Sequence, residues 1–164
     1  MNGDQEPASP DTFADIVDAY LKAPKICAAR MGWRENRQHK DYVRAQLRVL
    51  CPAMPRVRGR VVLLAHKYFF PRKYSFTLLF KSTRIVSLDI GPRRGHRNIL
   101  NRVSVQSTHW AFFPCDVVLP DERERAHGLW LAEFFERCKI DFRSRYERPV
   151  HDVEQPELPL WPKP

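Results

Sequence analysis

The strongest constraint on the fold lies between residues 60 and 90, where three strand-like segments follow one another with three residues between each. The segments are 60–70, 74–80 and 84–90, and all are rich in β-branched and aromatic residues, which favour strands. Connections this short imply that consecutive strands pair antiparallel. The sequence therefore predicts a β-meander.

Further elements are expected on either side of the meander. Ser9-Pro10-Asp11 supplies a helix N-cap and a proline at the first helical position, and Pro24 marks the end of that helix. A second helix is expected over about 33–50, before Cys51-Pro52. The alternating segment 102–113 predicts a fourth strand.

A C-terminal amphipathic helix is expected after Asp121, which with Glu124 forms a capping pattern. Its apolar face comprises His127, Trp130, Leu131, Phe134, Phe135 and Cys138. The predicted fold class is α+β: an antiparallel β-meander of about four strands, flanked by N-terminal helices and one C-terminal amphipathic helix. We expect one domain over 1–148 and an extended tail over 149–164, which contains five prolines.

Positive charge is concentrated in the middle of the chain. Residues 23–102 carry nineteen basic and three acidic side chains, whereas the segments before and after them carry net charges of −4 and −3. Such a field attracts polyanions, so nucleic acid, either RNA or DNA, is the expected partner. A solvated arginine-rich surface without a ligand is the alternative. The expected nucleic-acid-binding residues are a basic stripe on the second helix and a group near the two glycines of 91–95: Arg37, Lys40, Arg44, Arg48, Arg93, Arg94 and Arg97.

The cellular location is inferred from what the chain does not contain. No apolar run approaches the length of a membrane span, and the N-terminus does not resemble a signal peptide. The four cysteines, Cys27, Cys51, Cys115 and Cys138, lack CxxC spacing and are expected to be reduced and buried. We therefore expect a cytoplasmic protein with no membrane partner.

Two histidines could serve acid–base chemistry. His96 lies in the loop after residue 91, and His109 lies on the expected fourth strand. A metal-independent ribonuclease needs a base, an acid and cations, which His96, His109 and the nearby arginines could supply, with Asn98 orienting a phosphate or a base. The alternative is that His109 packs beside Trp110 and that His96 is an exposed loop residue. No cofactor is expected, and a metal site is disfavoured because ligand-pair spacing is absent.

The same residues carry a resemblance. Residues 88–91, His96 with Asn98, His109, and the helix residues Phe134, Cys138 and Ile140 occur in an order that resembles an uncharacterised family of small bacterial and phage proteins found on mobile elements. That family has a second histidine two residues after the strand histidine, where this chain has Ala111. The resemblance implies an accessory factor of a mobile element or of phage defence, of toxin type.

The tail carries a separate pattern. Gln155, Leu158, Leu160 and Trp161 resemble the peptide with which bacterial replication and repair proteins dock on the sliding clamp. A proline-rich linker could present such a peptide to a protein partner. Packing of these apolar residues back on the domain is the alternative.

Two functions from different classes therefore follow from the sequence. The first is a nucleic-acid-directed effector that could be a ribonuclease. The second is a non-enzymatic interaction protein, which binds nucleic acid, docks on the sliding clamp or counters a defence system. Whether the protein is an enzyme is left open.

Overall fold

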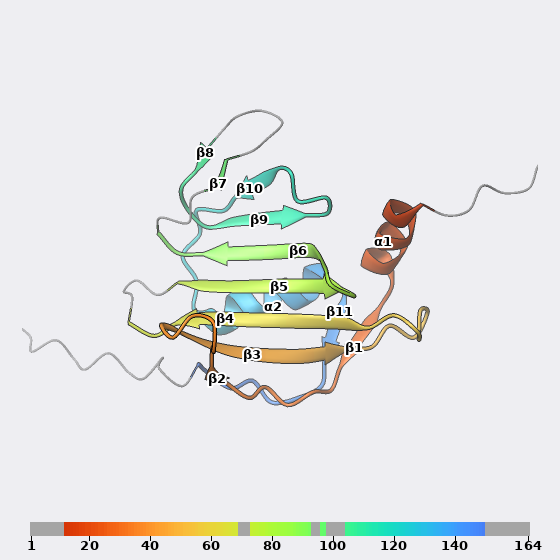
Figure 1. Ribbon diagram of the computed structural model, residues 1–164, viewed down its shortest axis with the longest axis horizontal. Helices are drawn as coiled ribbons and strands as arrows, with labels where there is room; N and C mark the ends of the chain where they lie inside the picture. The colour runs from red at the N-terminus through yellow and green to blue at the C-terminus, as the bar shows by residue number, and fades with distance from the viewer. Residues whose placement is uncertain (1–11, 69–72, 93–95, 98–103, 150–164) are drawn as a thin grey trace, which may run out of the picture.

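A seven-stranded antiparallel sheet forms most of the molecule (Figure 1). The computed structural model describes residues 12–68, 73–92, 96–97 and 104–149. In spatial order the strands are β10 (Val118–Pro120), β9 (His109–Phe112), β6 (Thr83–Ile90), β5 (Tyr74–Phe80), β4 (Gly59–His66), β3 (Tyr42–Val49) and β2 (Arg34–Glu35). The α+β class is confirmed, with more strands than expected.

The predicted meander is the centre of this sheet. β4, β5 and β6 are consecutive neighbours, and each pair is antiparallel. β4 ends at His66, earlier than expected, whereas β5 covers 74–80 as predicted. The tight β5–β6 turn places Lys81 in the left-handed region with φ 56°, and the Lys81 amide donates to the carbonyl of Arg58.

The predicted second helix is wrong, because residues 33–50 contain β2 and β3 instead. The reason lies in the burial pattern of β3. Val43, Ala45, Leu47 and Val49 are buried, whereas Arg44, Gln46 and Arg48 between them are partly or fully exposed. This period of two matches a sheet with one covered face, and pairing with β4 over the whole length of β3 overrides the local helical pattern.

The expected strand at 102–113 is divided in two. β8 (Ser104–Val105) pairs with β7 (His96–Arg97) in a separate two-stranded ribbon, while β9 joins the main sheet beside β6. Val105 packs with Ala111, Cys115 and Val118 in a small second core. The ribbon therefore adjoins the β9–β10 end of the sheet (Figure 1).

Both helices contribute to the main core, on one face of the sheet. In α1 (Phe13–Lys22), Val17 and Tyr20 are buried, and Tyr20 contacts Phe80 edge-on at 5.0 Å between ring centroids. The predicted cap at 9–11 lies outside the described residues, and the helix begins at Phe13, three residues after the expected first helical position, Pro10. Its N-cap is Thr12, which forms a capping box with Asp15.

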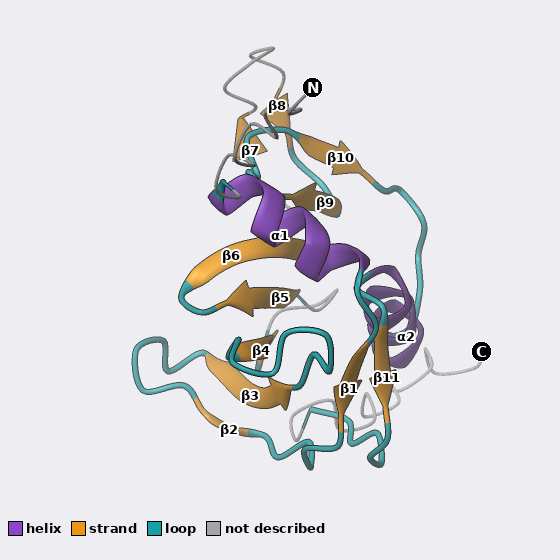
Figure 2. Cartoon of the chain, turned by 90° about the vertical axis from the view of Figure 1, so that its right-hand side faces the viewer, coloured by secondary structure: helices purple, strands orange, loops and turns teal. Residues whose placement is uncertain are grey.

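The C-terminal helix α2 (His127–Arg137) lies across the back of the sheet in Figure 1 and on the right of Figure 2. Its predicted apolar face is buried, and Phe134 stacks near Trp110 at 6.1 Å. The predicted capping role of Asp121 is wrong, because the N-cap is Ala126 and makes no side-chain hydrogen bond. Asp121 instead accepts hydrogen bonds from Trp110 Nε1 and from the Arg123 side chain.

A buried lysine joins the ends of the two helices. Lys25 is 1% exposed, and its Nζ donates to the carbonyls of Leu21, Ala23 and Cys138 at 3.3, 2.7 and 3.0 Å. These carbonyls lie at the C-terminal ends of α1 and α2, where the helix dipoles favour a cation. Lys25 also begins β1 (Lys25–Cys27), which pairs in parallel with β11 (Ile140–Phe142).

The four cysteines are buried free thiols, as expected. Burial raises the pKa of Cys138 to about 12 and also raises that of Cys27, so neither is a ready nucleophile. Among the described residues, no helix has the length and apolar character needed to cross a membrane.

Candidate functional site

The face of the sheet opposite the helices is the candidate site, and it is called the open face below. Figure 2 shows α2 on the other side of the sheet and α1 across the ends of the strands, and no other helix among the described residues covers the open face. On β3 it carries the side chains of Arg44, Gln46 and Arg48. The residues opposite them on β4 are, in the same order, Leu64, Val62 and Arg60. The open face therefore combines arginines with half-buried apolar residues.

Two pairs of arginines lie directly opposite one another on this face. The register of β2 and β3 places Arg34 opposite Arg44, and that of β3 and β4 places Arg48 opposite Arg60. Like charges at directly opposed positions have Cβ atoms about 5 Å apart and destabilise a sheet. Both pairs therefore cost stability unless an anion lies between or beside them.

None of these four arginines has an acidic partner within the described parts of the chain. Arg44 Nη2 donates to Gln46 Oε1 at 2.9 Å, and Arg60 Nη2 reaches the Lys81 carbonyl at 3.5 Å. The Nε of Arg44 is buried and makes no hydrogen bond to any described group. Arg34 and Arg48 lie at exposed positions, where their guanidinium groups can meet an acceptor from outside, and phosphate matches their planar geometry.

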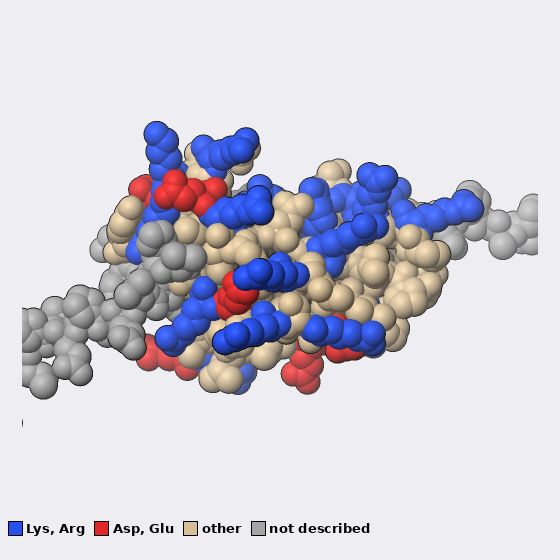
Figure 3. All heavy atoms as spheres, turned by 90° about the horizontal axis from the view of Figure 1, so that it is seen from below, with Lys and Arg blue, Asp and Glu red and all other residues tan. Residues whose placement is uncertain are grey.

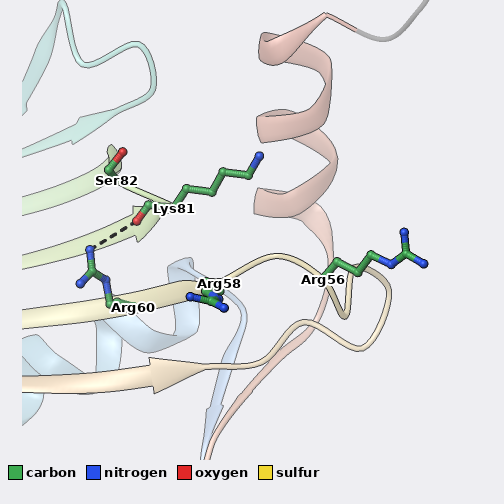
Figure 4. Close-up of a pocket in the computed structure, with 5 residues that line it drawn as sticks. All are labelled: Arg56, Arg58, Arg60, Lys81 and Ser82. Carbon is green, nitrogen blue, oxygen red and sulfur yellow. Dashed lines mark hydrogen bonds between the residues drawn. The ribbon is translucent and has the colours of Figure 1, made fainter.

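A basic pocket of about 630 Å³ continues this surface at the β5–β6 turn. Figure 4 shows the side chains that line it: Arg56, Arg58, Arg60, Lys81 and Ser82. Arg60 belongs both to this pocket and to the opposed pair with Arg48, and Arg84 continues the same row on β6 beyond Leu79. The pocket and the arginine pairs therefore form one continuous basic surface.

The predicted nucleic-acid-binding residues are only partly brought together. Arg44 and Arg48 share the open face of β3, whereas Arg37 and Lys40 lie in the connection between β2 and β3. Arg97 lies in β7, and Arg93 and Arg94 lie outside the described residues. Seen from the β2–β3 edge, Lys and Arg side chains cover far more of the surface than Asp and Glu do (Figure 3).

Sequence reasoning missed six basic residues of this surface: Arg34, Arg56, Arg58, Arg60, Lys81 and Arg84. One signal was available, since arginines alternate at 56, 58 and 60. Alternation places charges on one side of an extended chain. The opposition of Arg48 and Arg60 could not be found without the register.

The structure describes only part of the predicted catalytic site, which consists of His96, Asn98 and His109. His109 is 4% exposed, its Nδ1 donates to the Ser107 carbonyl at 2.7 Å, and its Nε2 lies 3.6 Å from Asp89 Oδ2. The backbone of His96 pairs with Val105 in the β7–β8 ribbon, and Asn98 lies outside the described residues. Catalysis by His96, Asn98 and His109 therefore stays a prediction.

The predicted partner-binding residues of the tail are Gln155, Leu158, Leu160 and Trp161. They lie outside the described residues, so docking through them stays a prediction as well.

His127 is a buried histidine that the sequence did not single out for chemistry. His127 packs among Trp33, Tyr74, Phe76 and Tyr146, with ring centroids 4.6–5.8 Å away. Burial, with a smaller contribution from Arg148, lowers its pKa to about 3, so the ring is neutral at physiological pH. His127 lies on α2 and packs against β5, so it takes no part in the basic surface.

The chain matches no protein-family model, no curated protein and no solved structure.

Proposed function

We propose that this protein is a nucleic-acid-binding protein that holds the phosphate backbone on its open face. The observation that carries the proposal is the pair of arginine–arginine oppositions, Arg34 with Arg44 and Arg48 with Arg60, without acidic partners among the described residues. A phosphate between two guanidinium groups turns this repulsion into attraction. Binding rather than catalysis is favoured because the basic surface is exposed, whereas His109 is buried.

The test is the salt dependence of binding. Affinities of wild-type protein and of Arg48→Gln/Arg60→Gln protein for labelled RNA and DNA are measured by fluorescence anisotropy in EDTA, from 50 to 300 mM salt. Each lost phosphate contact should reduce the slope of log K against log salt by about one, so the double variant should lose about two. Its affinity near 100 mM salt should fall about 100-fold.

The matched control removes two charges elsewhere. Arg143 and Arg145 are exposed residues after β11, and Arg143 is paired with Asp141. The variant Arg143→Gln/Arg145→Gln has the same net charge as the test variant and should bind nearly as wild type does. Equal losses in both variants would mean that only net charge matters. No binding by wild type at 50 mM salt would refute the proposed function.

A further inference from the structure

An aromatic cluster lies on the open face, at the opposite end of β3 and β4 from the basic pocket. Tyr42 and His66 are directly opposed, with ring centroids 4.8 Å apart. His39 and Tyr68 extend the cluster on either side, each 6.4 Å from its neighbour. Tyr68 is 75% exposed, which is unusual for so large a ring.

The aromatic cluster and the basic surface follow one another along the same strands. From Tyr42, every second residue of β3 faces the same side: Arg44, Gln46 and then Arg48. The distance along β3 from Tyr42 to Arg48 is about 20 Å at roughly 3.3 Å per residue. Half-buried Val62 and Leu64 lie beside this track on β4. A ligand along it would thus meet rings at one end and guanidinium groups over the remainder.

A surface with aromatic rings at one end and arginines along the remainder suits single-stranded nucleic acid better than a duplex. In a duplex the bases are stacked inside, and an exposed ring on the face of a sheet finds only phosphate and sugar. A single strand presents both its phosphates and the faces of its bases, which stack on aromatic side chains. The track lies on the face of a sheet, whereas reading a duplex groove requires a helix or ribbon that enters the groove.

We infer that the open face binds single-stranded nucleic acid. The bases stack on Tyr42 and Tyr68, and the phosphates lie along Arg44, Arg48 and Arg60 toward the basic pocket. The track accommodates about four nucleotides, which is at the low end of the site sizes of single domains that bind single strands. This inference rests on the proposed function and names its ligand class.

The test compares one sequence in two forms. Anisotropy with a labelled 12-nucleotide single strand and with the corresponding duplex should give at least tenfold tighter binding of the single strand. Tyr68→Ala should weaken single-strand binding about tenfold and leave duplex binding unchanged, because one stacked base is lost. Tyr42→Leu should act similarly while retaining apolar packing. The control is Leu129→Ala, which shortens an exposed side chain on α2, away from the open face.

Crosslinking gives a second measurement that does not depend on substitutions. Ultraviolet irradiation of the complex with an unmodified single strand, followed by peptide mass spectrometry, should place crosslinks in the peptides that carry Tyr42 and Tyr68. Equal or tighter duplex binding, or single-strand binding unaffected by either tyrosine variant, would overturn the inference and leave the proposed function standing. Absence of binding to both forms would instead overturn the proposed function and the inference with it.

Discussion

Two regions of this molecule are rich in arginine, and they use it in opposite ways. Beside α2, the side chains of Arg123, Arg125 and Arg137 donate to Glu133 at 2.9, 2.7 and 2.7 Å. On the open face, arginines lie opposite arginines instead. Arginine content alone therefore does not identify a binding surface; the acidic partners beside the arginines must be known as well.

The arginines beside α2 also cover aromatic rings. The Arg137 guanidinium lies 4.3 Å from the centroid of Trp110, and those of Arg123 and Arg125 lie 5.5 and 5.7 Å from that of Trp130. Cation–π contacts and ion pairs thus satisfy each guanidinium within the fold. We call these three arginines with Glu133 and Asp121 the C-terminal network, and we expect it to act on stability alone.

The largest expected effect is a loss of folding stability at low pH, caused by protonation of the buried His127. An unfolded histidine has a pKa near 6.5, whereas burial lowers that of His127 to about 3. The unfolded chain therefore binds the proton first, and stability that is complete above pH 6.5 is lost as the pH falls toward 3. The loss should be roughly 4 kcal/mol.

Urea unfolding at a series of pH values measures this loss. His127→Phe keeps an aromatic ring among the same neighbours and should remove most of the pH dependence between 6.5 and 4, which lies above the range in which Asp121 titrates. A variant that still loses stability over this range would show that another group is responsible.

The next effect tests whether the C-terminal network is structural. Glu133→Gln leaves three arginines without their shared carboxylate, so the free energy of unfolding should fall by about 2 kcal/mol. Nucleic-acid affinity should change less than about twofold. Glu124→Gln, at an exposed position, is the control. If Glu133→Gln altered binding as strongly as Arg48→Gln/Arg60→Gln, the division between the two regions would be wrong.

A smaller loss of stability in acid is expected from Asp121, and it also tests whether the C-terminal network is structural. The hydrogen bond from Arg123 and, less strongly, that from Trp110 lower the pKa of Asp121 to about 2, although burial opposes them. The stabilisation is present above about pH 4, the unfolded pKa, and is lost as the pH falls toward 2. In the His127→Phe background this loss should be about 1 kcal/mol and should be absent from Asp121→Asn protein. Thermal unfolding between pH 4 and 2 measures it.

The smallest expected effect has the opposite sign and comes from the open face. Arg34→Gln removes the repulsion with Arg44 and should raise the free energy of unfolding by about 0.5 kcal/mol. The same change should weaken nucleic-acid binding about tenfold. Arg37→Gln, in the β2–β3 connection, should leave stability unchanged. A loss of stability in Arg34→Gln protein would mean that the arginine pair supports the fold.

The elements predicted well were those whose evidence is local. The meander was predicted from two short connections, which span 67–73 and 81–82 in the structure, and the apolar face of α2 was predicted from helical spacing. The prediction of a helix over residues 33–50 was wrong because their apolar positions fit a helix as well as a strand. Pairing with β4 decides in favour of the strand. Even so, Arg44 and Arg48 were expected on one face, because a spacing of four shares a face in both structures.

The candidate site was harder to predict, since its residues meet through register. Arg48 and Arg60 are separated by a connection whose length does not determine which residues of β3 and β4 are opposed. Tyr42 and His66 meet by the same register, with 23 residues between them. The sequence shows the positive charge of this region but not that its arginines oppose one another.

The buried Lys25 has a consequence for the order in which the chain folds. Its ammonium group needs the Cys138 carbonyl, and β1 needs β11 as its strand partner. Both partners are among the last described residues to be synthesised. A nascent chain that has emerged only as far as β10 would contain the whole seven-stranded sheet but would leave this lysine incompletely coordinated. The contact of Lys25 with Cys138 and the pairing of β1 with β11 can form only when residues 138–142 are present. Folding should therefore be completed only after these residues have left the ribosome.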